Sequence, residues 1–460
     1  MHSATTGLTQ GSPLSPTLFG VFADGLIRLI QQRCPTVGPL TVDGLRVPVI
    51  AYADDFLLMA TSPEDLQRLL HIVAEWCVMV GMLVNPDKTV IMRFPEVPLQ
   101  GVTWSYGGAS LQVVVCTRYL GVYVSSRAGI GETFQHLHQR MQASWALMIR
   151  RYHNLRSAPS VGLLLRLFLA CVVPTASYAS EVWGFRSFPG ASHSFTAESL
   201  VTTYLSMLRQ LAGVRQSVAT PILLEELAVQ PLRDIWLRRA VTFWNSLAGL
   251  PANHLFARVA RGNCFLGVTT HAPTWAGSLM RTLVRTGYPY PIDAHRLHVV
   301  VWGAVSTLLR HRAHRPWVDL HAAPLLCPSG RAQLCTYFRW FRRPLHVPRA
   351  RIFSLVIDAR RLRVFLRFRM GVHGLPIDVG RQRGVARSER RCDMCSTGAV
   401  GDEYHFVFVC PALAPVRAHY AALFGPLFRT LRAFLWQEDL LAVVRFVYDC
   451  FRVRSQLLTR

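Results

Sequence analysis

The sequence Ala51-Tyr52-Ala53-Asp54-Asp55 places two adjacent acids between two apolar runs, 47–51 and 56–60. A strand, a tight turn and a returning strand would hold both carboxylates at the tip of a hairpin. Two charges beside apolar strands are costly unless a partner neutralises them, and carboxylate oxygens are ligands of divalent cations. The pattern therefore predicts a metal site, and an Asx-stabilised hairpin turn is the alternative.

Three further blocks surround this stretch. Upstream, a loop punctuated by glycine and proline opens onto an apolar helix that should end near Arg33, and its sequence is Gly7-Leu8-Thr9-Gln10-Gly11-Ser12-Pro13-Leu14-Ser15-Pro16. Downstream are Gly81-Met82-Leu83-Val84-Asn85-Pro86-Asp87-Lys88-Thr89 and Arg118-Tyr119-Leu120-Gly121-Val122. In this order and at these intervals, the four blocks resemble the palm of reverse transcriptases of non-LTR (LINE-type) retrotransposons.

The resemblance implies a role for each block. Asp54 and Asp55 correspond to metal-binding acids, Asp54 being the more directly catalytic, and Lys88 corresponds to a lysine beside the departing pyrophosphate. The positions expected to contact nucleotide, primer or template are Gln10, Gly11, Tyr52, Ala53, Tyr119, Leu120 and Gly121. The implied reaction is RNA-directed DNA synthesis by two-metal phosphoryl transfer, with Mg²⁺ or Mn²⁺, an RNA template, a DNA primer and deoxynucleotide triphosphates.

Lys88 is unusual by composition, because it is the only lysine among 50 basic residues. Lysine can release a proton when its pKa is depressed, whereas arginine in practice cannot. This favours a chemical role for Lys88, and a stray surface lysine is the alternative.

The family palm includes a further aspartate on a strand ahead of the Gln-Gly block, but only nine residues precede Gln10. Asp24 and Asp43 have no motif that would make them substitutes. The sequence thus looks like the C-terminal part of a larger reverse transcriptase, and we expect the chain alone to polymerise poorly or not at all. We also expect an exposed sheet edge. The alternative function is a non-enzymatic RNA- or DNA-binding remnant of a retroelement.

A second chemical motif is C-x2-C-x9-H-x4-C, formed by Cys392, Cys395, His405 and Cys410. Three thiolates and an imidazole close a tetrahedron around Zn²⁺ with no open position, which is typical of a structural site. Four unrelated buried residues are the alternative, although the polar loop 398–403 favours zinc. The segment resembles the C-terminal zinc-binding element of many non-LTR reverse transcriptases. His419 is a weaker candidate ligand.

The net charge is +24, and residues 339–391 carry fifteen arginines against three acids. Such a stretch suits phosphate contact, and interleaved aromatic residues would add base stacking. A solvated basic face is the alternative. The aromatic residues concerned are Phe338, Trp340, Phe341, Phe353, Phe365 and Phe368.

Eight of the eleven cysteines are isolated in apolar surroundings and should be reduced core thiols. They are Cys34, Cys77, Cys116, Cys171, Cys264, Cys327, Cys335 and Cys450. We find neither a signal peptide nor an apolar segment long enough to span a membrane. We therefore expect an intracellular, nuclear protein with no membrane partner, and the sequence does not indicate the oligomeric state.

Apolar periodicity predicts helices over 131–153, 160–179, 197–213, 232–249 and 298–309, and Ser62 should cap another that runs to Val80. The predicted fold class is α+β. A partial palm, with an antiparallel sheet packed on helices, should span 1–124. A helical thumb-like region follows at 125–260, then a helical, basic connecting region at 261–370, and finally a zinc-binding element with C-terminal helices at 371–460.

Overall fold

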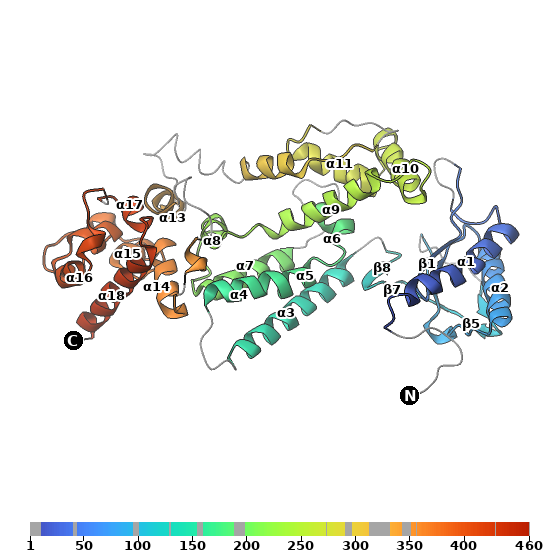
Figure 1. Cartoon of the computed structure of the whole chain (residues 1–460), viewed down its shortest axis with the longest axis horizontal. Coiled ribbons are helices and arrows are strands. Elements are labelled where there is room, and N and C mark those ends of the chain that lie inside the picture. The colour runs from blue at the N-terminus through green and yellow to red at the C-terminus, as the bar shows by residue number, and fades with distance from the viewer. Residues whose placement is uncertain are drawn as a thin grey trace. The chain divides into compact units, whose positions relative to one another are not determined.

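The computed structural model describes residues 11–39, 44–94, 101–127, 130–153, 160–187, 198–272, 274–289, 297–311, 332–342, 351–355, 357–427 and 429–459. The chain divides into two compact units. The first unit comprises Met1–Thr133, Phe243–Arg281 and Tyr290–Val300, and the second comprises Phe134–Thr242, Thr282–Pro289 and Val301–Arg460. Most elements are helices, and all named strands lie in the first unit (Figure 1), which confirms the predicted α+β class. The four-part division of the chain remains a prediction.

The acidic stretch forms the hairpin that the sequence predicts. Strands β1 (Val49–Tyr52) and β2 (Asp55–Leu58) pair antiparallel, with Ala51 opposite Phe56 and Tyr52 opposite Asp55. One face of the hairpin packs on helices α1 (Ser15–Arg33) and α2 (Pro63–Val80). The two helices supply most of a core that includes Leu26, Ile30, Leu69, Val73 and Trp76 and against which Val49, Phe56 and Leu58 pack.

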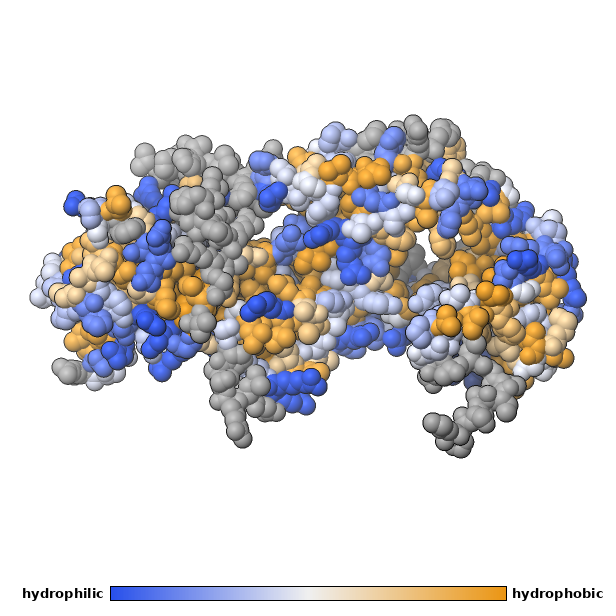
Figure 2. Space-filling view, viewed as in Figure 1, coloured by the Kyte–Doolittle hydropathy of each residue, from blue (hydrophilic) through white to orange (hydrophobic). Residues whose placement is uncertain are grey.

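The other face of the hairpin is open. Ile50, Tyr52 and Leu57 are exposed, Tyr52 by 63%, and no third strand pairs with β1 or β2 among the described residues. Helix α1 adds an exposed apolar stripe at helical spacing, and apolar surface is visible on the N-terminal unit in Figure 2. The stripe consists of Leu14, Leu18, Val21 and Phe22. Among the described residues, β1 and β2 pair only with each other, so each has an outer edge without a neighbouring strand, as expected.

Helix α2 begins and ends where its sequence predicts. Ser62 caps the first turn, because its hydroxyl accepts a hydrogen bond from the Asp65 amide at 3.1 Å. Pro63 occupies the first helical position, and Gly81 ends the helix in a left-handed conformation (φ 70°).

The rest of the palm segment consists of short two-stranded sheets. β4 (Ser105–Tyr106) pairs with β5 (Ala109–Ser110), and β7 (Cys116–Tyr119) pairs with β8 (Val122–Ser125), both antiparallel. β3 (Val90–Ile91) and β6 (Gln112–Val113) are parallel and follow the short 3-10 helix η1 (Pro86–Lys88).

Four of the expected long helices are confirmed as α3 (Gly131–His153), the run from α4 (Val161–Leu167) through η2 (Phe168–Val172) to α5 (Val173–Ala176), α7 (Glu198–Ala212) and α9 (Leu232–Ala248). The helix expected over 298–309 instead starts at Trp302. Sequence reasoning missed two helices, α10 (Leu255–Thr269) and α11 (Trp275–Arg285). Shorter elements are α6 (Ser180–Trp183), η3 (Gly184–Ser187) and α8 (Thr220–Leu227).

The C-terminal part is a cluster of short helices around one long helix. The elements are α13 (Ala332–Thr336), η4 (Tyr337–Phe341), η5 (Arg351–Ser354), α14 (Ala359–Arg369), α15 (Pro376–Gln382), η6 (Arg387–Glu389), η7 (His405–Val409), η8 (Pro411–Leu413), α16 (Ala414–His419), η9 (Ala421–Leu423), α17 (Leu431–Leu435) and α18 (Leu440–Leu458).

Burial corrects the expectation of base stacking for three of the six aromatic residues. Phe338, Trp340 and Phe353 are half-buried, and for them it stays a prediction. Phe341, Phe365 and Phe368 are almost completely buried, and Phe368 packs against Phe341, Phe406 and Phe451. These rings form core contacts and are not available to stack on bases. The burial of these rings does not test the other part of the expectation, which is phosphate contact by the arginines.

The cysteines mostly follow the expectation of reduced core thiols. Cys34, Cys77, Cys264 and Cys450 are buried free thiols. Three positions differ, because Cys116 is half-buried, Cys171 is exposed and Cys335 takes part in a disulfide. Cys327 lies outside the described residues. Within the described ranges no single helix has the length and hydropathy to cross a membrane, although one bent pair of segments, Val161–Ala176 with Ser180–Arg186, meets those criteria jointly.

A buried ion pair joins α14 to α8 in the second unit. Arg369 and Glu226 have 1% and 2% of their side chains exposed, and Nη2 donates to Oε1 at 2.7 Å. Tyr337 also donates its hydroxyl to Glu226 at 2.5 Å, and the Arg369 guanidinium lies 3.6 Å above the Trp436 ring. A charge so enclosed depends on its partner, because water cannot replace it.

Removing that partner should destabilise the second unit strongly. We expect Glu226→Ala to lower the free energy of unfolding by about 3–5 kcal/mol, since it leaves Arg369 charged and buried. Urea denaturation followed by tryptophan fluorescence measures this. The control is Glu198→Ala, which removes the exposed partner of Arg233 at 2.6 Å and should cost less than about 1 kcal/mol. Equal losses in both variants would contradict the interpretation.

Candidate functional site

The two acids lie at the tip of the β1–β2 hairpin. The Tyr52–Asp55 pair closes a two-residue turn made of Ala53 and Asp54. Ala53 has a φ of 51°, a left-handed conformation that costs a non-glycine residue roughly 1–2 kcal/mol. Both carboxylates are exposed, and neither forms an ion pair or hydrogen bond with another described side chain. The turn thus presents two adjacent anionic groups to solvent.

A second hairpin tip approaches the first. Tyr119 pairs with Val122 across a turn of Leu120 (φ 46°) and Gly121 (φ 81°), the geometry of a type I′ turn. Burial, together with the nearby charge of Asp55, raises the pKa of Tyr119. The structure therefore brings Tyr119 near Asp55, as sequence blocks about sixty residues apart could not show by themselves.

The remaining candidates are local features whose contacts with the acids are not established. Lys88 is exposed in η1, whose start is capped by the Asn85 side chain, which accepts from the amides of Asp87 and Lys88 at 3.0 and 3.3 Å. Gly11 is exposed with a φ of 88°. Gln10 and Asp43 lie outside the described residues, and Asp24 pairs with Arg28 at 2.6 Å on α1.

The four predicted zinc ligands converge. The ligand atoms of Cys392, Cys395, His405 and Cys410 all lie within 4.8 Å of one another. Cys392 Sγ is 3.9 Å from Cys410 Sγ, and Cys395 Sγ is 3.4 Å from His405 Nε2. A tetrahedral Zn²⁺ with Zn–S of about 2.3 Å separates its sulfur ligands by about 3.8 Å, so these spacings fit the ion. It is the only group of three or more potential ligands found in the described part of the chain.

Two local structures create this convergence. The first is a tight loop in which Cys392 N donates to Ala399 O and Gly401 N to Arg390 O, both at 2.8 Å, which places Cys392 and Cys395 on one side. The second is the π-helical turn η7, where Cys410 N donates to His405 O at 2.7 Å. This i→i+5 bond returns the chain after five residues, and so explains the x4 spacing between His405 and Cys410.

The thiols influence one another electrostatically. Burial raises the pKa of Cys410 to about 12, and the neighbouring thiols add to the shift. Burial would also raise the pKa of Cys395, but hydrogen bonds from Thr397 and His405 outweigh it and lower the pKa to about 6. A cation at the centre would stabilise all three thiolates together.

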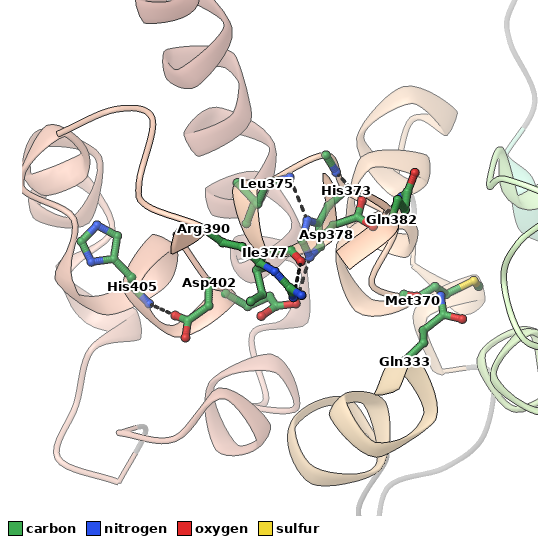
Figure 3. Close-up of polar contacts among 12 residues, drawn as sticks. Gln333, Met370, His373, Leu375, Ile377, Asp378, Gln382, Arg390, Asp402 and His405 are labelled. Atoms are coloured by element: carbon green, nitrogen blue, oxygen red, sulfur yellow. Dashed lines mark hydrogen bonds and ion pairs between the residues drawn. The ribbon is translucent and has the colours of Figure 1, made fainter. Parts of the chain in front are cut away.

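Polar contacts, some of them buried, fix the loops that carry the ligands (Figure 3). Asp402 accepts from the His405 amide at 2.9 Å and pairs with Arg387 at 2.7 Å. The buried Glu403 contacts His373 Nε2 at 3.0 Å, and His373 Nδ1 accepts from the Leu375 amide at 3.2 Å. Because Nδ1 accepts, Nε2 carries the proton and donates to Glu403.

Asp378, in α15, also fixes the chain near His373 through buried polar contacts. Its carboxylate accepts from the Gly374 amide at 2.9 Å, from Gln382 at 2.8 Å and from Arg215 at 3.3 Å (Figure 3 shows Asp378 and Gln382). Sequence reasoning missed Asp378, His373 and Glu403 as supporting residues. Their partners are distant in sequence, and only a Glu-x-His spacing before Cys410 could have pointed to Glu403.

Together, an Asp-Asp hairpin on two helices and a Cys₃His cluster with the spacing of a zinc site fit the expected palm segment and zinc-binding element. Comparison with known proteins agrees. Residues 2–124 match the family described as reverse transcriptase (RNA-dependent DNA polymerase). The relatives below are named as polymerases or Pol polyproteins of transposable elements, which confirms the resemblance to non-LTR retrotransposon reverse transcriptases.

A probable RNA-directed DNA polymerase from transposon BS of Drosophila melanogaster is 30% identical over 191 residues, 39% of this chain and 20% of that protein. A Pol polyprotein from retrotransposable element R2 of Popillia japonica is 38% identical over 84 residues, 18% of this chain and 12% of that protein. The RNA-directed DNA polymerase from mobile element jockey of Drosophila melanogaster is 24% identical over 235 residues, 50% of this chain and 24% of that protein. The matched stretches thus span a quarter or less of these relatives.

The cluster predicts one zinc ion per chain. We expect Cys395→Ser to abolish stoichiometric zinc, because it removes one of four convergent ligands. Elemental analysis of protein purified under reducing, chelator-free conditions measures this. The matched control is Cys171→Ser, which changes an exposed free thiol and should leave zinc content unchanged. Full zinc in Cys395→Ser, or none in the unmodified chain, would refute the assignment.

Zinc should also stabilise its own segment selectively. We expect chelation to increase protease cleavage within residues 385–425, because metal-binding free energy contributes to local folding there. Cleavage in residues 44–94 should stay unchanged, since that core contains no cluster ligand. Cleavage sites mapped by mass spectrometry, before and after chelation, decide between this and general unfolding.

Proposed function

We propose that the chain is the part of a non-LTR retrotransposon RNA-directed DNA polymerase that carries the metal-binding hairpin. The observation that carries the proposal is the exposed Asp54–Asp55 tip within the segment that matches the reverse-transcriptase family. Carboxylates on a short, core-anchored hairpin can reach a primer end without moving the helices beneath. RNA template, DNA primer and deoxynucleotide triphosphates are the corresponding partners, and the nucleus is the corresponding location.

Each site residue then has a role. Asp54 and Asp55 hold the divalent metal, Mg²⁺ or Mn²⁺, which when bound supplies charge stabilisation and an activated primer hydroxyl. Lys88 lies beside the leaving pyrophosphate. Tyr52 and Ala53 lie against the primer end, Gln10 and Gly11 contact nucleotide and template, and the Tyr119, Leu120 and Gly121 turn holds the primer.

The geometry of the two hairpin tips supports these roles. Ala53 occupies a turn position with a small side chain, so backbone and substrate can approach closely. The Tyr119 hydroxyl, whose pKa is raised by burial and by the charge of Asp55, is protonated and able to donate a hydrogen bond beside Asp55. The hydroxyl adds no negative charge to a site that already has two.

The Cys₃His cluster serves structure in this proposal. Its four ligands would fill the tetrahedral positions of Zn²⁺ and leave none for a substrate or water. Cys392, Cys395, His405 and Cys410 would hold two loops together and thereby shape the surface of the C-terminal part.

A non-enzymatic nucleic-acid binder is the second candidate function. No third acid or other metal ligand joins Asp54 and Asp55 within the described residues. The second unit meanwhile exposes several arginines: Arg360, Arg361, Arg367, Arg383, Arg387 and Arg391. An exposed basic surface favours binding to phosphates even where catalysis is absent.

Primer extension separates the two functions. We expect the chain alone, with Mg²⁺, template, primer and nucleotides, to show no synthesis above an Asp54→Ala, Asp55→Ala variant. Joining the chain to the segment of the jockey polymerase that precedes the matched stretch should produce extension, because that protein is named as an RNA-directed DNA polymerase.

The same double substitution in the joined protein is the control. It should abolish extension, because the metal-holding carboxylates are gone. Extension by the chain alone that the double variant lacks would show that the chain needs no further acid. Extension that persists in the joined double variant would remove the hairpin from catalysis.

A further inference from the structure

A cavity of about 290 Å³ lies between α15, the Cys392–Cys395 loop and α18. Four arginines contribute to its lining, Arg383, Arg390, Arg391 and Arg454, against two acids, Glu389 and Asp393. The cavity is therefore electropositive overall.

The arginines differ in how they are neutralised. The charge of Arg454 is neutralised, because its guanidinium pairs with the Asp393 carboxylate at 2.5 and 3.2 Å. Arg390 is fixed by carbonyls, and donates to Val385 O at 2.9 and 2.6 Å and to Ile377 O at 3.3 Å.

Arg383 and Arg391 are the exposed cations of the cavity. Neither has a carboxylate partner among the described residues. Carbonyl dipoles do not cancel the Arg390 charge either. Asp393 is already paired with Arg454, so Glu389 is the one remaining acid in the lining against Arg383, Arg390 and Arg391. An anion that binds between these arginines would balance the excess positive charge.

The position of Arg390 is built into the fold. A Cβ at residue 380 would lie 2.5 Å from Arg390 Cγ, so only glycine there allows the arginine to lie flat along α15. Figure 3 shows Arg390 beside Ile377, between the α15 turn and the loop that carries Asp402. A cation held in one orientation loses little conformational entropy when it binds.

A second basic cavity next to the first favours an extended anion as ligand over a small one. A second cavity of about 400 Å³ also has Gly374 in its lining, together with Arg367 and with Arg215, which pairs with Asp378. Two basic cavities that share Gly374 in their linings suit a ligand with successive negative charges. The phosphodiester backbone of a nucleic acid has this chemistry.

The same surroundings argue against base recognition. Phe365 and Phe368, two of the expected stacking residues, are fully buried. No phenylalanine, tyrosine or tryptophan lines either cavity, and the imidazole of His373 in the second cavity is buried and bonded to Glu403. Contacts here would therefore be to phosphates and independent of base sequence.

We propose that Arg383, Arg390 and Arg391 form a phosphate-binding cleft that holds a single nucleic-acid strand by its backbone. This deepens the nucleic-acid-binding function proposed above and rests on it. Arg391 directly precedes Cys392, and Arg391 bridges to Val400 within the loop that carries two zinc ligands. The wall of the cleft is thus part of the zinc-binding element.

Fluorescence anisotropy with two labelled single strands of about 20 nucleotides tests the cleft. One strand is oligouridylate RNA and the other is a base-free sugar–phosphate strand of the same length. The full zinc-loaded chain should bind both strands within threefold of each other. Arg383→Ala, Arg391→Ala should weaken both at least tenfold, and the slope of log K against log salt should flatten by about 1.4, since each contact contributes about 0.7.

Matched variants separate the cleft from general surface charge. Arg150→Ala, Arg151→Ala removes the same charge from α3, where both arginines are exposed, and should change affinity less than threefold. Glu389→Gln removes a cavity acid and should strengthen binding about twofold. Zinc content of each variant confirms that the element is folded.

The outcomes are distinguishable. No RNA binding by the unmodified chain removes the nucleic-acid-binding function itself. Equal weakening by the two double variants, or binding of the oligouridylate but not of the base-free strand, overturns the cleft and leaves that function standing. Displacement of the strand by an equal phosphate concentration of inorganic phosphate would show a site for an isolated anion, and would also overturn the backbone assignment.

Discussion

The backbone holds groups that can share one ligand at short range, and the functional parts of this chain depend on this constraint. Asp54 and Asp55 share a hairpin tip, three thiols share a cluster with His405, and Arg383, Arg390 and Arg391 are among the four arginines that line one cavity. In each place the backbone fixes groups that would separate if they were free. The free energy of the fold therefore maintains sites in which a bound ion of opposite charge would stabilise the charged forms of these groups.

The scaffold beneath each site explains how this is sustained. The acidic hairpin rests on the core between α1 and α2, where Trp76 and Leu69 are buried and Phe56 packs against them. The cluster rests on the Glu403–His373 contact and on Asp378, all buried. The Arg369–Glu226 pair follows the opposite rule, because its charges cancel within the protein and need no ligand.

Sequence predicted those features that depend on neighbours in the chain. The Ser62 cap, the end of α2 before Gly81 and the Asp-Asp turn depend only on neighbouring residues. The Cys and His spacing of the cluster is also local, because two nearby loops bring the four ligands together. Resemblance to a family added the roles. What sequence could not give depends on packing between distant segments. Phe365 and Phe368 look like stacking residues in a basic stretch, but the helices around them turn both inward. The partners of Arg369 and His373 lie 143 and 30 residues away.

The π turn at His405 has a consequence for how this region can vary. A π turn contains one residue more than an α turn, so the chain from His405 to Cys410 has a single permitted length. Loss of one residue would restore ordinary helical phase and rotate the imidazole away from the last thiol, while most side chains kept their character. The segment therefore tolerates substitution of side chains better than insertion or deletion of a residue.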